Sequence, residues 1–119
     1  MATAVYLNPL RTQFDWHRRV VESLGLHFVP TASVTETLQQ LTQTSVPLVI
    51  LSSSGGYSVE EAAFTIKWRH DLTNIVVLSS NHAPERLPEP VDAWICVADH
   101  EDILRERLRP FAGDQVAAR

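Results

Sequence analysis

A run of small polar residues follows an apolar stretch near the middle of the chain. Leu48 to Leu51 lead into Ser52–Gly56, which is three serines and two glycines, and Ser58 then begins a helical pattern. In open α/β sheets, ligands and reactive groups lie beyond the carboxyl ends of the strands. A serine becomes a nucleophile only beside a base, and no histidine or acid is predictable next to Ser52. We therefore expect no enzymatic activity from this segment.

Two other interpretations of the serines stay open. Glycine and serine before a helix can present backbone N–H groups to an anion, so this loop could cradle an anion or another small ligand. The spacings of the common phosphate-binding loops are absent, however, and the loop follows the third apolar run rather than the first. The alternative is that a protein kinase phosphorylates Ser52–Ser54.

The remaining metal-binding and nucleophilic residue types form no cluster along the chain. Cys96 is the one cysteine and lies in the apolar run "AWICV", so we expect an inert, buried thiol. The acidic stretch 99–102 is typical of a capped helix start. The histidines show no metal-ligand spacing, and two of them, His17 and His70, are expected on helix surfaces. We predict neither a metal nor a cofactor. The five histidines are His17, His27, His70, His82 and His100.

Composition narrows the function classes. The chain has 119 residues, of which 45% are hydrophobic, enough for one domain with a single core. The formal net charge of −4 argues against a nucleic-acid partner and against an anionic membrane surface. Neither an 18-residue apolar span nor a signal-peptide pattern is present, so we expect a cytoplasmic protein. We expect one domain over 1–112 and a flexible tail over 113–119.

Five short apolar runs alternate with helical patterns. Three of the runs are almost purely apolar, as strands covered on both faces must be. Pro84, Pro88 and Pro90 exclude a regular helix between the last two runs. Alternating strands and helices predict a doubly wound parallel α/β sheet with its fourth helix shortened or absent. The runs are 4–7, 26–29, 48–51, 75–78 and 93–97.

Four predicted helices have recognisable starts and apolar stripes. Each start carries a capping residue followed three positions later by an acid. Gly25 is a natural stop for the first helix, and Pro110 should end the last one. The capping pairs are Thr12–Asp15, Ser33–Glu36, Ser58–Glu61 and Asp99–Asp102. The predicted core stripes are Phe14, Val21 and Leu24; Val34, Leu38 and Leu41; Val59, Ala63 and Ile66; and Ile103, Leu104 and Leu108.

Three segments together resemble one family. "SVPLVILSSSGG", "NIVVLSS" and "VDAWICVADHEDIL" are similar to the third strand, the fourth strand and the fifth strand with its helix in the receiver domain of bacterial response regulators. The resemblance covers nearly the whole chain. It implies a flavodoxin-like sheet with the order 2-1-3-4-5.

The resemblance also implies a phosphorylation site, in which this chain differs at four of five positions. Receivers accept a phosphoryl group on an aspartate after the third strand, with two acids for Mg²⁺, a β4 hydroxyl and a lysine. Asn8 and Pro9 stand at the acidic positions, Ser52 at the phosphoacceptor and Val97 at the lysine, and only Ser79 keeps its type. Mg²⁺ usually needs carboxylates. The resemblance therefore implies a degenerate, or pseudo-, receiver.

A pseudo-receiver would act through protein contacts in two-component or phosphorelay signalling. In the family, the fourth helix, fifth strand and fifth helix form the usual partner or dimer surface. On that surface we predict contacts from Trp94, Cys96, Arg105 and Arg109, and we expect a homodimer through it. Trp16 and Trp68 also lie off the predicted core stripes. They either pack at the edges of their helices or form a binding hot spot, where large aromatic residues are frequent.

Two alternatives to this function remain. One is a sensor that binds a nucleotide, quinone or anion at the carboxyl ends of the strands, near Asn8, Ser52–Gly56 and Ser79. The other is a working phosphoreceiver with unusual chemistry at Ser52.

Overall fold

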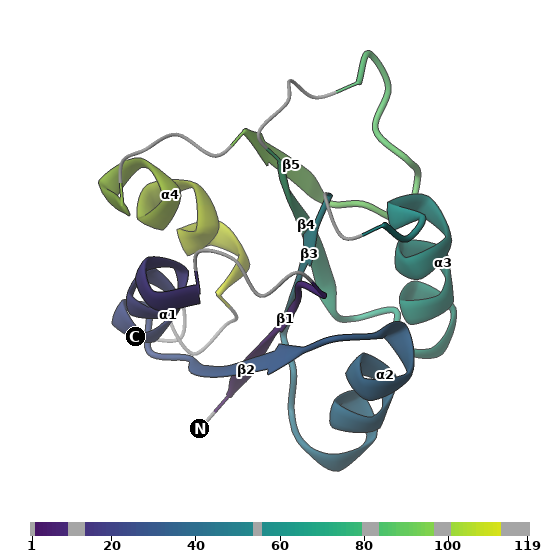
Figure 1. Ribbon diagram of the computed structural model, residues 1–119, viewed down its shortest axis with the longest axis horizontal. Coiled ribbons are helices and arrows are strands. Elements are labelled where there is room, and N and C mark those ends of the chain that lie inside the picture. The colour runs from purple at the N-terminus through teal and green to yellow at the C-terminus, as the bar shows by residue number, and fades with distance from the viewer. Residues whose placement is uncertain (1, 10–13, 54–55, 80–83, 97–100, 113–119) are drawn as a thin grey trace.

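The protein forms a five-stranded parallel sheet between two layers of helices (Figure 1). The computed structural model describes residues 2–9, 14–53, 56–79, 84–96 and 101–112. The strand order is β2-β1-β3-β4-β5, which confirms the predicted doubly wound topology. The strands are β1 (Thr3–Leu7), β2 (His27–Thr31), β3 (Leu48–Ser52), β4 (Asn74–Ser79) and β5 (Ala93–Cys96).

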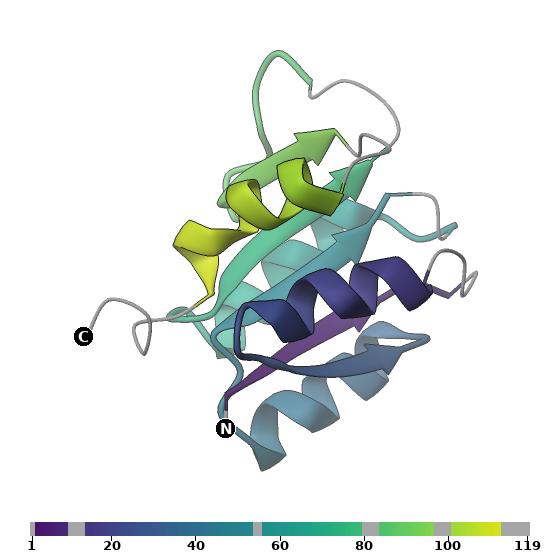
Figure 2. The same ribbon diagram turned by 90° about the vertical axis from the view of Figure 1, so that its left-hand side faces the viewer.

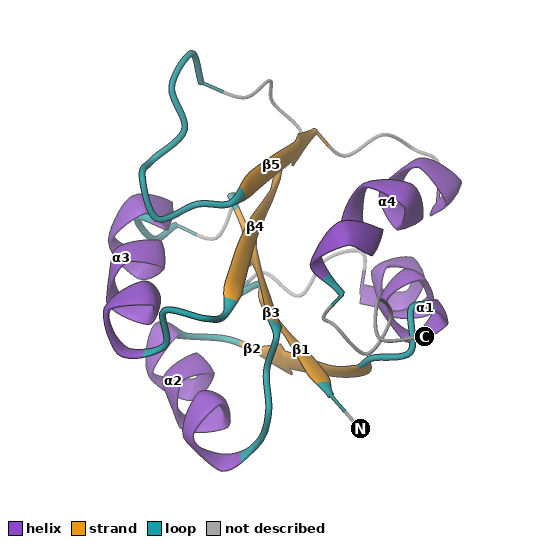
Figure 3. Cartoon of the chain, turned by 180° about the vertical axis from the view of Figure 1, so that it is seen from behind, coloured by secondary structure: helices purple, strands orange, loops and turns teal. Residues whose placement is uncertain are grey.

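The helices divide evenly between the two faces of the sheet (Figures 1 and 3). The first and last helices, α1 (Phe14–Ser23) and α4 (Glu101–Leu108), lie side by side on one face, as Figure 2 shows. The other two, α2 (Val34–Gln43) and α3 (Val59–Arg69), cover the opposite face. A short 3₁₀ turn, η1 (Arg109–Phe111), follows α4 and contains Pro110, so the last helix ends where the proline predicted.

The strand register aligns the carboxyl ends of the central strands. Leu7 pairs with Leu51, and Ser52 pairs with Leu78 on the next strand. The residues that follow β1 and end β3 and β4 therefore meet at one edge of the sheet. Throughout this article, "carboxyl edge" means this edge.

The predicted helix caps form at both starts that lie within the described residues, Ser33 and Ser58. The Ser33 Oγ accepts from the Glu36 N–H at 3.1 Å, and the Glu36 carboxylate accepts from the Ala32 N–H at 2.8 Å. At α3 the Ser58 Oγ likewise accepts from the Glu61 N–H at 3.1 Å. Gly25 has φ +86°, the left-handed conformation that ends a helix at low cost. The pairs that begin at Thr12 and Asp99 lie outside the described residues.

The connection between β4 and β5 contains no helix over residues 84–92, as the three prolines predicted. Asp92 fixes its end. The Asp92 carboxylate accepts from the Ile75 N–H at 2.7 Å and pairs with the Lys67 ammonium at 3.0 Å, while the Asp92 N–H donates to the Ile75 carbonyl. These contacts bind the connection to the start of β4 and to the end of α3.

Two apolar clusters fill the space between the sheet and its helices, one on each face. Most predicted stripe residues are buried or packed at the edge of these clusters. Among the stripe residues whose side chains the structure describes, Ile103 is the exception, because it is 41% exposed while Leu104 and Leu108 make the contact with the sheet. The side chain of Phe14 lies outside the described part. The described residues include no helix long and apolar enough to cross a membrane.

Candidate functional site

Three predicted site residues come together at the carboxyl edge. Asn8 follows β1 directly, Ser52 is the last residue of β3 and Ser79 the last of β4, and these strands are adjacent. All three side chains are buried, Asn8 to 1% exposure, and Pro9 is half-buried. Val97 lies outside the described residues. The described side chains at this edge are therefore neutral.

Asn8 belongs to a buried hydrogen-bond chain. Its side-chain N–H donates to the Tyr6 hydroxyl, with 3.3 Å between the nitrogen and the oxygen. The Tyr6 oxygen lies 2.8 Å from His17 Nδ1. The two side chains share this hydrogen bond, in which the neutral imidazole accepts from the phenol or donates to it according to its tautomer. Asn8 is thus joined to α1 through two neutral side chains.

Burial keeps this chain of side chains uncharged. His17 is 4% exposed, and burial lowers its pKa to about 4. Burial raises the pKa of Tyr6 to about 12, and the hydrogen bond from Asn8 partly offsets that rise. The His17 Nε2 atom is buried and finds no hydrogen-bond partner in the described part of the chain. Protonating the ring would therefore place a charge in an apolar environment.

The expectation that His17 lies on a helix surface is wrong. It belongs to the same stripe as Val20, Val21 and Leu24, at positions i, i+3, i+4 and i+7, and so it faces the sheet. Its ring contacts Tyr6 edge-on at 5.4 Å between centroids, and Trp16 at 4.3 Å. The stripe is visible in the sequence and could have identified His17 as a core residue.

Tyr57 directly precedes Ser58, the N-cap of α3, and its side chain reaches across the carboxyl edge. Its hydroxyl donates to the Ser52 carbonyl at 2.6 Å and lies 3.5 Å from the Leu7 carbonyl. Its ring packs against the core cluster between the sheet and α2 and α3, and burial raises the pKa of Tyr57. Backbone carbonyls are ligands that hard cations use. Here the Ser52 carbonyl instead accepts a hydrogen bond from the neutral phenol of Tyr57.

We predict that Tyr57→Phe lowers the free energy of unfolding by about 1 kcal/mol, because it removes the donor to a part-buried carbonyl while keeping the ring. Urea unfolding of the variant and the parent at pH 7 measures the difference. Tyr6→Phe serves as a comparison, since it removes a hydroxyl from the His17 contact instead. A Tyr57→Phe variant as stable as the parent would show that the bond at 2.6 Å contributes nothing.

The described residues do not fit a magnesium site. They contain no group of three or more His, Cys, Asp or Glu side chains that could hold a metal ion. Asn8 offers a metal ion one neutral ligand, its amide oxygen, and the Pro9 side chain offers no oxygen. The small-ligand alternative stays a prediction, because residues 54–55, 80–83 and 97–100 lie outside the described part of this edge.

The predicted partner contacts on β5 are only half-exposed. Trp94 packs against the core cluster beneath α2 and α3. Cys96 is half-buried, so the prediction of a buried thiol is wrong. β5 is the last strand of the sheet, with a neighbour on one side alone, and this explains the greater exposure.

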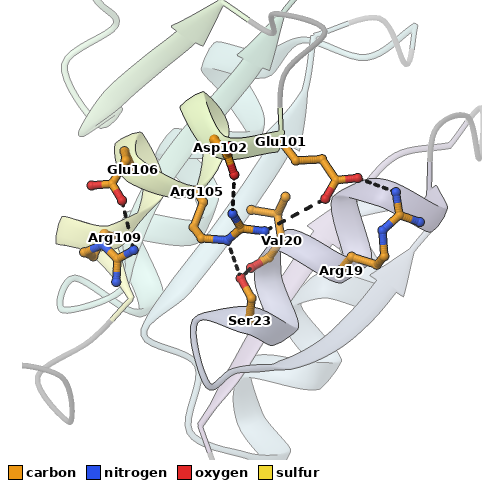
Figure 4. A network of polar contacts seen from close by, with 8 residues as sticks. All are labelled: Arg19, Val20, Ser23, Glu101, Asp102, Arg105, Glu106 and Arg109. Atoms are coloured by element: carbon orange, nitrogen blue, oxygen red, sulfur yellow. Dashed lines mark hydrogen bonds and ion pairs between the residues drawn. The ribbon is translucent and has the colours of Figure 1, made fainter.

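The predicted contacts on the last helix are engaged within the chain (Figure 4). Arg105 donates to Ser23 of α1 at 2.8 Å and to Asp102 at 2.8 Å, while Arg109 pairs with Glu106 at 3.0 Å. Arg19 of α1 also pairs with Glu101. Arg105 and Arg19 thus hold α4 against α1, while Arg109 is paired within its own helical segment. A partner would have to compete for these contacts.

The other two tryptophans differ from each other. Trp16 is half-buried and packs against the core cluster beneath α1 and α4. Trp68 is 79% exposed on α3. Both tryptophans lie off the predicted core stripes, but of the two only Trp68 is exposed.

No protein-family model and no curated protein matches this sequence. Solved structures do match it. The response regulator TrrA of Thermotoga maritima, bound to Mg²⁺-BeF, has a TM-score of 0.79 at 18% identity, over 93% of this chain and 99% of that one. TrrA in complex with the histidine kinase ThkA also gives 0.79, at 17% identity, over 95% and 100%.

An orphan response regulator of H. pylori has a TM-score of 0.76 at 16% identity, over 95% of this chain and 97% of that one. Each match spans nearly the full length of both chains, and each has low sequence identity. The parallel sheet with order β2-β1-β3-β4-β5 is the same arrangement that the sequence predicted. This chain has the fold of a response-regulator receiver domain.

Proposed function

We propose that the chain is a pseudo-receiver, a protein-interaction module of a signalling assembly that works without aspartyl phosphorylation. The observation that carries the proposal is the neutral carboxyl edge. Ser52 ends β3 and Asn8 follows β1, and the resemblance implies that these are the positions of the phosphoacceptor and of an acid in receivers. An acyl phosphate needs a carboxylate, and Mg²⁺ usually needs at least one.

The local contacts favour a single, constitutive conformation. Tyr57 joins the carboxyl end of β3 to that of β1, and Asn8 is tied to α1 through Tyr6 and His17. Introducing a doubly charged group there would mean burying charge next to apolar and neutral groups, which is costly. Regulation would then come from binding a partner. A receiver-fold neighbour in complex with a histidine kinase supports the idea that such surfaces bind proteins.

Thermal unfolding with Mg²⁺ and beryllofluoride tests the proposal. We expect no change in Tm, with either ion alone or with both. The Thermotoga maritima regulator whose structure holds Mg²⁺-BeF is the positive control. A ligand at about 100 times its Kd stabilises by about 2.7 kcal/mol, which is roughly 10 °C for a domain of this size. A saturable rise of that kind in this protein would contradict the proposal.

A further inference from the structure

The two helices on one face of the sheet are bound to each other as well as to the sheet. Arg105 of α4 donates to the Ser23 hydroxyl of α1 at 2.8 Å, and Arg19 of α1 pairs with Glu101 of α4 (Figure 4). Apolar residues of both helices also belong to one cluster against the sheet. We call this pair of helices the α1–α4 layer.

His17 is a buried titratable side chain in this layer. It is 4% exposed, and its Nδ1 atom lies 2.8 Å from the Tyr6 oxygen of β1. Its Nε2 atom is buried and has no hydrogen-bond partner in the described part of the chain. On the opposite face, neither α2 nor α3 contains a histidine, and His70, which follows α3, is half-buried. Within the described residues, an imidazole is therefore buried against the sheet in the α1–α4 layer alone.

The surroundings of the His17 ring hold no described carboxylate that pairs with it. Tyr6, from β1, is the titratable group in contact, and it stays neutral. The charged side chains of α1 that the structure describes are exposed, and Arg18 and Glu22 pair with each other. From β2, His27 is exposed. The carboxylates that begin α4 are in contact with arginines: Glu101 with Arg19 and Arg105, and Asp102 with Arg105.

A proton on His17 would favour a state in which α1 has left the sheet. Protonation makes both ring nitrogens donors and adds a charge. The Tyr6 oxygen can accept one of these N–H groups, but the other would stay unpaired in an apolar environment, which costs free energy. The cost disappears when the ring reaches water. An opening of α2 or α3 gains nothing from the proton, because it leaves His17 buried.

The contacts between the two helices do not depend on this proton. The bond from Arg105 to Ser23 joins a guanidinium to a hydroxyl, and neither group changes its protonation state between pH 7 and pH 5. The link between α1 and α4 therefore persists under conditions that weaken the contact of α1 with the sheet. When α1 opens, α4 is drawn with it.

We propose that His17 makes the α1–α4 layer acid-sensitive, so that acid releases α1 and α4 together from the sheet while α2 and α3 stay in place. The inference goes beyond the pseudo-receiver role, because it gives the domain a response that needs no phosphoryl group. A domain that accepts phosphate could have the same device, and a pseudo-receiver could lack it. The two proposals therefore fail separately.

Hydrogen exchange of the whole chain at pH 7 and pH 5, corrected for intrinsic exchange rates, tests the release. The amides of α1 and α4 should share one opening constant, larger than that of the β3 amides. Lowering the pH from 7 to 5 should raise this constant about 20-fold, because the pKa of His17 is about 4 in the folded protein and about 6.5 when it is exposed. The amides of α2 and α3 should show a smaller change.

Two results would overturn the proposal. Equal changes in all four helices would mean that the proton acts only through global unfolding. Opening of α1 while α4 stays protected would mean that the two helices do not move together.

Matched histidine variants assign the effect to His17. His17→Gln should abolish the 20-fold rise, whereas His27→Gln, which changes an exposed histidine on β2, should keep it. Titration of the parent by NMR gives an independent readout if His17→Gln does not fold. The His17 ring should stay neutral at pH 5 in the folded protein. A ring that is protonated there while α1 stays protected would overturn the proposal.

Discussion

Ser52→Asp is expected to lower the free energy of unfolding at pH 7 by about 3 kcal/mol more than Ser52→Asn does. The two substitutions have the same shape and differ in charge. Ser52 is 7% exposed, and the described side chains around the carboxyl edge, Asn8, Tyr57 and Ser79, carry no charge. The aspartate variant would therefore bury a carboxylate among neutral groups.

The pH dependence of this penalty has a definite sign. An unfolded aspartate has a pKa near 3.9, and burial raises the pKa in the folded state. The penalty is therefore absent below about pH 4 and grows as the pH rises. Urea unfolding of the two variants at pH 7 and near pH 4 measures it. Equal stability at pH 7 would reveal a cation beside Ser52 and would contradict a neutral edge.

Lowering the pH from 7 to 5 is expected to cost the parent about 2 kcal/mol more stability than it costs His17→Gln. The pKa of His17 is about 4 in the folded protein and about 6.5 when unfolded. Between these values the unfolded chain binds the extra proton, so stability is present above pH 6.5 and is lost as the pH falls towards 4.

Tyr6 is the other titratable side chain that contacts His17 in the described structure, and with a pKa of about 12 it stays neutral throughout. Carboxylates that titrate below pH 5 are common to both proteins and cancel in the comparison. Urea unfolding at half-unit steps of pH gives the two slopes. Equal slopes would mean that His17 is protonated in the folded state, and the neutral chain from Asn8 to α1 would be wrong.

The sequence predicted the fold well because its signals are local. Apolar runs located all five strands, and the caps at Ser33 and Ser58 located two helix starts. Pro84, Pro88 and Pro90 correctly excluded a helix over 84–92. Ile103 was wrongly placed in the core because it is next to Leu104 in the sequence but lies about 100° round the helix from it.

The site was predicted only in part. Positions at strand ends could be assigned, since parallel strands bring Asn8, Ser52 and Ser79 to one edge. Tyr57 could not, because its partner carbonyls belong to Ser52 and to Leu7, which is fifty residues away in the sequence. The same holds for Arg105, whose contact with Ser23 joins α4 to α1 across eighty-two residues. His17 was missed although its stripe was visible.

Intact mass after incubation with acetyl phosphate and Mg²⁺ tests the neutral carboxyl edge most directly. The parent protein should keep its unmodified mass at every time point, with or without the metal. Ser52→Ala, incubated in parallel, should behave identically. A Mg²⁺-dependent gain of one phosphoryl group in the parent that is lost in Ser52→Ala would contradict the account.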